Sequence, residues 1–375
     1  MKQFFGCVLI VSLLILAGCG KASSGNAALP QAPYVIALSQ PYGTPGNLYA
    51  LSPTTGTIEK LNLKIGNIPN DMLIDNGNLY VVNAGDSTIS VISISETASN
   101  LYLDNQGVIS FTPLSQSSPN YPEYITVTTS QGIQKGYVTL NGSNYVAVLN
   151  MEKNTVLGYI PITSYTKWIS SFGPYPWGVA VVNKKIMVTN FGVDYGACTK
   201  AGCPYTAPGM VSVIDPSTDS LLTPVTTTTG INLQAVEPLT QTGFIVISNG
   251  NYGSIGGYAE LFDNAFAEKT AIPLSGGGSG IAISTTGIGY VALNSIVGYD
   301  TINTNTGLWI TTTDLSKQVS GLTGYNLTSI KFAPDGTLWA TDWQDNMVFE
   351  IDPQTNKVIK TFTLPEPAQD VVFVY

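Results

Sequence analysis

The chain has 375 residues, a formal net charge of −9 and a charged fraction of only 10%. It contains neither histidine nor arginine, which excludes imidazole bases, histidine-ligated metals or haem, and guanidinium clamps for phosphate. Because lysines are few and unclustered, we expect neither nucleic acid nor an anionic lipid surface as a partner.

Residues 1–18 have the features of a lipoprotein signal peptide. Lys2 provides a positive start, and residues 8–16 form an apolar run that is too short to span a bilayer stably. The run Leu-Ala-Gly-Cys that ends at Cys19 resembles the bacterial lipobox, which implies cleavage before Cys19 and its acylation. Gly20, where Asp would signal retention, favours the outer membrane in the enteric sorting rule. The alternative is an ordinary cleavage site beside a chance cysteine.

Residues 19–33 are small, polar and proline-containing, which predicts a lipidated, flexible tether. Residues 34–375 are then one exported domain, held by membrane lipid through Cys19, since several acyl chains together anchor a protein stably. We therefore expect the protein in the cell envelope, at the outer membrane, with its domain in the periplasm or on the surface.

A short apolar strand that ends in Asn or Asp recurs every 45 to 59 residues along the domain. Its six copies end at Asn83, Asn141, Asn190, Asn249, Asn294 and Asp342. A following strand often ends in Asp, and a polar turn then leads into a third strand. No stretch shows a sustained helical period, and Gly-, Pro- and Asn-rich breaks separate the units. This pattern predicts four-stranded antiparallel units at the spacing of propeller blades.

These units, with their YVxN, VxVID and T-x-K elements, resemble the YVTN-type β-propeller repeat family, which implies an all-β propeller and hardly anything about activity. Six blades are marked by the Asn- or Asp-ending strands. Three further strands lie between residues 34 and 65, and a lone strand covers residues 369–375. Pairing the last strand with residues 34–39 completes a seventh blade. We therefore predict a seven-bladed propeller closed by both termini, which removes exposed strand edges.

The longest insertions fall in loops that share one face of a propeller, and they are rich in aromatic residues. The largest covers residues 190–210, and a second covers residues 249–257. Because aromatic anchors carry much of the energy of interfaces, this face is predicted to recognise a neutral, partly apolar partner. The alternative is that the rings fill the ends of the channel. The candidates are Tyr121, Tyr175, Trp177, Phe191, Tyr195, Tyr205, Tyr252 and Trp343.

Cys198 and Cys203 are the one pair left when Cys7 leaves with the signal peptide and Cys19 carries lipid. In an exported domain such a pair is expected to form a disulfide, here one that shapes the longest loop. A CxxC redox motif is absent, and a metal site would need more soft ligands, so no metal is assigned to this loop.

No catalytic residue is assigned, and binding is favoured over catalysis. Gluconolactonase-type propellers use Glu, Asn and Asp around a central divalent ion, and Asn83, Asn190, Asn249, Asn294 and Asp342 are candidates for such a set. Their recurrence at one repeat position is better explained by a turn that every blade needs. A periplasmic calcium-dependent hydrolase or lactonase is the alternative function, with calcium as its cofactor; otherwise we expect no cofactor.

The scarcity of charge favours a protein exposed to acid, because few ion pairs are lost when carboxylates are protonated. Compositional drift in an exported β protein is the alternative. Lipobox and low charge together resemble surface lipoproteins of acidophilic iron- and sulfur-oxidising bacteria, of the licanantase type. The resemblance implies a non-enzymatic adhesion module for a solid or hydrophobic substrate such as mineral sulfur. A scaffold that binds an envelope or respiratory protein is the remaining alternative.

Overall fold

The computed structural model describes residues 26–30, 33–97, 100–114, 119–162, 173–199, 203–205, 208–239, 243–251, 256–324 and 326–374. The predicted signal peptide, Cys19 and Tyr252 lie outside these residues, and their predictions stay predictions. In the described ranges, no helix combines the length and apolar character needed to cross a bilayer.

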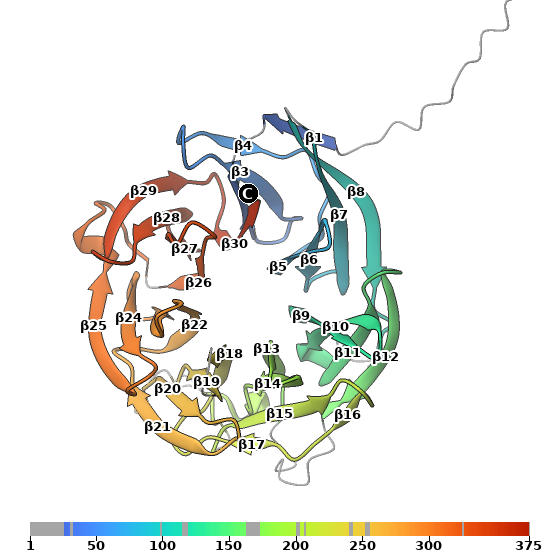
Figure 1. The fold of residues 1–375 in the computed structure, drawn as a ribbon, viewed down its shortest axis with the longest axis vertical. Coiled ribbons are helices and arrows are strands. Elements are labelled where there is room, and N and C mark those ends of the chain that lie inside the picture. The colour runs from blue at the N-terminus through green and yellow to red at the C-terminus, as the bar shows by residue number, and fades with distance from the viewer. Residues whose placement is uncertain are drawn as a thin grey trace, which may run out of the picture.

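Seven antiparallel sheets stand as blades around a central channel, which confirms the predicted propeller (Figure 1). The strands nearest the channel, one from each blade, are β30 (Ala368–Val374), β5 (Pro69–Asp75), β9 (Pro122–Ser130), β13 (Pro176–Val182), β18 (Leu233–Leu239), β22 (Gly278–Ile283) and β26 (Leu327–Phe332). In the same blade order, 1 to 7, the second strands are β2 (Tyr34–Ser39), β6 (Asn78–Asn83), β10 (Ile133–Leu140), β14 (Lys185–Asn190), β19 (Gly243–Ser248), β23 (Ile288–Leu293) and β27 (Leu338–Asp342).

The outer half of each blade contains two further strands. The third strands are β3 (Asn47–Leu51), β7 (Thr88–Glu96), β11 (Tyr145–Asn150), β15 (Met210–Asp215), β20 (Tyr258–Phe262), β24 (Gly298–Asn303) and β28 (Met347–Asp352). The fourth strands are β4 (Ile58–Lys60), β8 (Asn100–Ser110), β12 (Thr155–Pro161), β16 (Ser220–Leu221), β21 (Glu268–Pro273), β25 (Leu308–Asp314) and β29 (Lys357–Thr363). Blades 2 and 4 carry a fifth strand, β1 (Asn26–Pro30) and β17 (Val225–Thr226). Among the described residues, the 3₁₀ turns are η1 (Asn141–Ser143), η3 (Tyr195–Ala197) and η4 (Leu315–Lys317).

The second strands are apolar at nearly every position because both faces of a blade are covered by its neighbours. All six residues of β2 and of β19 are buried. Strands buried on both faces read as continuous apolar runs instead of alternating ones. The outer strand β29, by contrast, alternates between exposed and covered positions. This is why the second strands gave the clearest repeat in the sequence.

The ring is closed by both termini, as predicted. Strand β30 pairs with β2 from Tyr34↔Val374 to Ser39↔Ala368, so the C-terminal strand becomes the innermost strand of blade 1 (Figure 1). Val371 is fully buried in a core shared with Trp339 of blade 7. Closure therefore depends on the last seven described residues.

Neutral hydroxyl–carbonyl hydrogen bonds join three pairs of adjacent blades. Three second-strand threonines donate to the innermost strand of the next blade, at 2.6, 3.2 and 3.1 Å: Thr139 to Trp177 O, Thr189 to Gln234 O and Thr341 to Gln369 O. Such neutral bonds remain when carboxylates are protonated. These three joints between blades thus do not depend on charge.

Strand β1 lies within the segment that the sequence predicted to be a tether, and here the structure differs from that interpretation. It pairs antiparallel with β8, from Asn26↔Asp104 to Pro30↔Asn100. Leu29 is fully buried and Ala27 is nearly so, in a core with Leu101 and Leu103 of β8. Strand β1 is short and contains alanines and a proline, which is why composition alone assigned this segment to the tether.

Candidate functional site

The loops after second strands and those entering innermost strands lie on one face of the ring, which we call the loop face. Between blades 3 and 4 this face carries an aromatic cluster. Trp177 stacks on Phe191 with ring centroids 4.4 Å apart, and its other neighbour is Tyr124, at 5.8 Å. Tyr175 packs edge-on against Tyr195 at 4.8 Å. Four predicted residues thus gather in two adjoining pairs.

The polypeptide backbone fixes the cluster. Tyr175 has a φ of +48°, and its amide donates to Asn144 Oδ1 at 2.8 Å. The amide of Phe191 in turn donates to the carbonyl of Tyr175 at 3.2 Å. Tyr175, Trp177 and Phe191 are half-buried, and Tyr195 is 52% exposed. The cluster is therefore an ordered, partly solvent-facing apolar surface.

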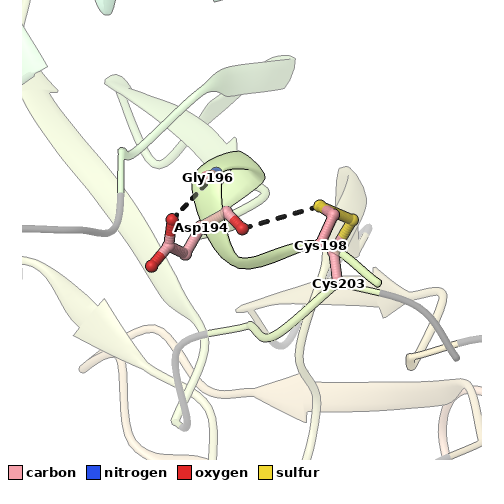
Figure 2. Close-up of a disulfide and its surroundings, with 4 residues drawn as sticks. All are labelled: Asp194, Gly196, Cys198 and Cys203. Carbon is pink, nitrogen blue, oxygen red and sulfur yellow. Dashed lines mark hydrogen bonds between the residues drawn. A yellow bond between two sulfur atoms is a disulfide. The ribbon is translucent and has the colours of Figure 1, made fainter. Parts of the chain in front are cut away.

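The loop after β14 is braced by the predicted disulfide between Cys198 and Cys203, whose Cα atoms are 4.1 Å apart (Figure 2). The Asp194 carboxylate accepts a hydrogen bond from the Gly196 amide at 3.0 Å and caps η3, which carries Tyr195. Tyr205 bridges back to Val193. The disulfide thus holds together the two arms of the loop that presents Tyr195.

The remaining candidates lie elsewhere on the loop face. Trp343 packs edge-on against Tyr42 at 5.5 Å, where blades 7 and 1 meet. Tyr121 precedes β9 with a φ of +45° and is 38% exposed. The sequence analysis did not single out Tyr124 or Tyr42, because the contacts of these residues depend on which blade lies beside them.

The central channel is lined by all seven innermost strands and encloses about 470 Å³. Lys331 is one of its lining residues, with Nζ 2.7 Å from Asp370 Oδ2 and 3.8 Å from Asp71 Oδ1. The two carboxylates also join blades: Asp370 accepts from the Met72 amide and Asp71 from the Ile125 amide, both at 3.0 Å. Lys331, Asp71 and Asp370 therefore hold the wall of the channel together.

Burial shifts the protonation of the channel carboxylates. It raises the pKa of Asp71 to about 7, against the opposing effect of Lys331. Burial likewise raises the pKa of Glu237 to about 7, and that of Glu123 well above its usual value. For Lys331, burial alone would lower the pKa, but the charges of Asp370 and Asp71 raise it. The channel thus takes up protons more readily than an exposed surface would.

The sequence does contain a signal for the charged residues of the channel, because they lie inside otherwise apolar strands. In a chain with so few charges, Asp71, Glu237, Lys331 and Asp370 each interrupt an innermost strand. Because the sequence predicted the functional surface in the loops, these four strand positions were not among the predicted site residues.

The side chains of the recurrent Asn and Asp residues at the ends of second strands bond to backbone and side-chain groups of nearby loops and strands. Asn83 Oδ1 accepts from the Gly66 amide at 3.0 Å, and Asp342 Oδ1 accepts from the amides of Gln344 and Asp345 at 2.9 and 3.2 Å. Asn190 donates to Met210 O at 2.9 Å, and Asn294 donates to Asn249 Oδ1 at 2.5 Å. Within the described ranges no three carboxylate or cysteine side chains lie close enough together to hold a metal ion.

No protein-family model and no curated protein matches this chain. Solved structures match it over most of their length. A periplasmic gluconolactonase from Pseudomonas aeruginosa is 13% identical, covers 92% of this chain and 99% of its own, and has a TM-score of 0.64. A Bacteroides fragilis protein assigned as a 6-phosphogluconolactonase is 14% identical, with 92% and 99% coverage and a TM-score of 0.63. Hydrazine synthase from Kuenenia stuttgartiensis is 14% identical, with 87% and 94% coverage and a TM-score of 0.56.

At these identities the likeness shows the fold alone, and propellers carry many unrelated functions on that fold. The function of this chain has to be argued from its own surface.

Proposed function

We propose that this protein is a lipid-anchored binding module of the cell envelope, which holds an uncharged, partly apolar surface through the aromatic cluster between blades 3 and 4. The observation that carries the proposal is the ordered stack of Trp177 on Phe191, next to the exposed ring of Tyr195. Half-buried aromatic rings supply contact area at low entropic cost, as at protein interfaces.

Two features support binding over catalysis. Asp71 and Asp370 of the channel are engaged in bonds between blades, and Asn83 accepts a hydrogen bond from the Gly66 amide. The disulfide and the cap at Asp194 brace the loop that presents Tyr195, and a braced surface pays less ordering entropy on binding. The substrate we propose to test is elemental sulfur, an uncharged apolar solid.

The test measures adsorption of the full-length, detergent-solubilised protein to sulfur particles. We expect Tyr195→Ser and Phe191→Ala to lower adsorption several-fold, because both remove apolar area from the cluster. Trp309→Ala is the matched control, since Trp309 is 48% exposed on the outer strand of blade 6. Urea denaturation of each variant separates lost contact from lost fold.

Adsorption that is unchanged in both cluster variants would contradict the proposal. Failure to bind sulfur, together with capture of one stoichiometric envelope protein by the wild type but not by Tyr195→Ser, would replace adhesion with the scaffold function. Mass spectrometry of the mature N-terminus tests the lipid on Cys19 independently.

A further inference from the structure

We propose that the central channel binds a small amphipathic amine, with the ammonium group at Glu237 and the apolar body in the half of the channel away from the loop face. This site lies apart from the aromatic cluster, so its test is independent of the test of the proposed function. The class of ligand follows from the lining of the channel and from its charged groups.

The channel continues beyond the cavity already described. A second cavity of about 520 Å³ is lined by the second halves of the innermost strands of blades 1, 2, 5, 6 and 7. Because the innermost strands begin at the loop face, this cavity, which we call the end pocket, lies on the opposite side of the ring. Glu237 and Lys331 line both cavities. Both volumes fall within the range of about 300–1,000 Å³ that is usual for ligand pockets.

The two halves of the channel differ in polarity. The half next to the loop face combines apolar residues with polar ones such as Gln234 and Gln369. The residues that line the end pocket alone are all apolar, and Ile74, Ile283 and Phe332 among them are partly exposed. A ligand that extends from Glu237 away from the loop face therefore contacts an apolar wall.

The charged groups of the channel lining include more carboxylates than ammonium groups. Among the described residues they are Asp71, Glu237 and Asp370 against Lys331. Lys331 is engaged by Asp370 and Asp71, and both of these carboxylates also accept main-chain amides. No described residue donates a hydrogen bond to Glu237, and the charges that act on its carboxyl group are those of Lys331 and Asp71. The group left for a ligand is therefore an acceptor, and the net charge around it favours a cation.

An ammonium group supplies what Glu237 lacks. Burial raises the pKa of this carboxyl group to about 7, so its ionisation without a partner is unfavourable. A bound ammonium group donates charge-assisted hydrogen bonds to the carboxylate and removes that cost. A carboxylate ligand would instead add a further negative charge to the channel, and an alcohol would bring no countercharge. The adjoining end pocket favours an apolar body, because contact there buries apolar area. The ligand is therefore a primary amine with an alkyl or aryl body.

The test titrates the full-length protein in detergent at pH 8 with 4-phenylbutylamine, followed by isothermal calorimetry and compared with a blank of detergent alone. The alcohol 4-phenylbutan-1-ol and the anion 4-phenylbutanoate carry the same apolar body with a neutral and a negative head. We expect one amine to bind per chain. The alcohol and the anion should bind about tenfold more weakly or less, because a hydrogen bond to a charged group contributes about that much to affinity.

The variant Glu237→Gln keeps the shape of the side chain and removes its charge. It should weaken binding of the amine by about tenfold or more and leave binding of the alcohol nearly unchanged. Glu152→Gln is the matched control, because Glu152 is an exposed carboxyl group in the turn between β11 and β12, on the same side of the ring as the end pocket. Ile283→Ser should weaken binding of all three probes by reducing the apolar contact. Urea denaturation of each variant checks that the fold is kept.

Equal affinity for the three probes, or amine binding that is unchanged in Glu237→Gln, would overturn the proposal. So would the absence of saturable amine binding by the wild type at millimolar concentration. Amine binding that is lost in Phe191→Ala but kept in Glu237→Gln would assign the amine to the aromatic cluster and refute the channel site. The sulfur assay reports on the aromatic cluster whichever of these results is obtained.

Discussion

The buried carboxylates in and near the channel lead to a specific prediction of how the stability of the protein depends on pH. Glu237 lies on β18 and lines the channel beside Lys331. Burial raises its pKa from 4.5 to about 7, although the charge of Lys331 acts in the opposite direction. A carboxyl group whose pKa is higher in the folded state binds its proton more tightly there. The free energy of unfolding must therefore fall as the pH rises from about 4.5 to 7.

The size of this effect follows from the shift. A shift of one pKa unit corresponds to about 1.4 kcal/mol, so the ionised Glu237 lowers stability above pH 7 by at most about 3 kcal/mol. Glu237→Gln replaces the carboxyl by a neutral group of nearly the same shape. We expect this variant to be more stable than the wild type by up to that amount at pH 8 and equally stable at pH 4.

The assay is urea denaturation followed by tryptophan fluorescence at pH 8 and pH 4. Asp352→Asn is the control with the opposite sign. The hydrogen bonds from Thr355 and Gln354 lower the pKa of Asp352, so this variant should lose stability at pH 8 and match the wild type near pH 2. A Glu237→Gln variant that is destabilised at pH 8, or whose effect is the same at both pH values, would refute the reasoning.

The same effect of burial on carboxyl groups offers a mechanism for the hypothesis that the protein is exposed to acid. Burial raises the pKa of seven carboxyl groups among the described residues, namely Asp71, Asp75, Glu123, Glu237, Glu260, Asp342 and Glu350. Protonation of these groups stabilises the fold as the pH falls toward 4. Below that range the turn carboxylates with lowered pKa values begin to lose their contribution. An unfolding transition between pH 4 and 2 at room temperature would count against an acid-exposed protein.

Two further predictions concern the frame of the propeller and its loop face. Removing residues 369–375 should prevent stable folding. The loss of three buried valines of β30 costs about 5–9 kcal/mol, which is as much as the whole stability of a typical domain. If the truncated protein melts like the full-length chain when followed by circular dichroism, the closure argument is wrong. Replacing both Cys198 and Cys203 by Ser should remove roughly 2 kcal/mol of stabilisation from the loop. We expect faster amide hydrogen exchange around Tyr195 and a nearly unchanged melting temperature of the ring. Amide exchange as slow as in the wild type would show that the disulfide does not brace the loop.

The blade count and the closure could be predicted because their signals are local. Asn83 and its equivalents end a buried apolar strand, and a turn follows in each blade, so one repeat could be recognised from its own residues. The closure followed from one unpaired strand at each end and from the cost of an exposed edge. Cys198 and Cys203 paired as predicted because they lie in the same loop.

What the sequence could not supply are the contacts that join different blades or depend on depth in the ring. Lys331 meets Asp71 and Asp370 because closure brings innermost strands from blades 7, 2 and 1 to one channel, although Asp71 lies 260 residues from Lys331 along the chain. Tyr124 joins Trp177 because adjacent blades present them side by side. Strand β1 pairs with β8 because the extended hairpin of blade 2 offers an edge. The sequence by itself determined the repeating unit and how often it occurs, whereas the tertiary structure decided which of its few charges and exposed rings meet, since those contacts exist only once the ring has closed.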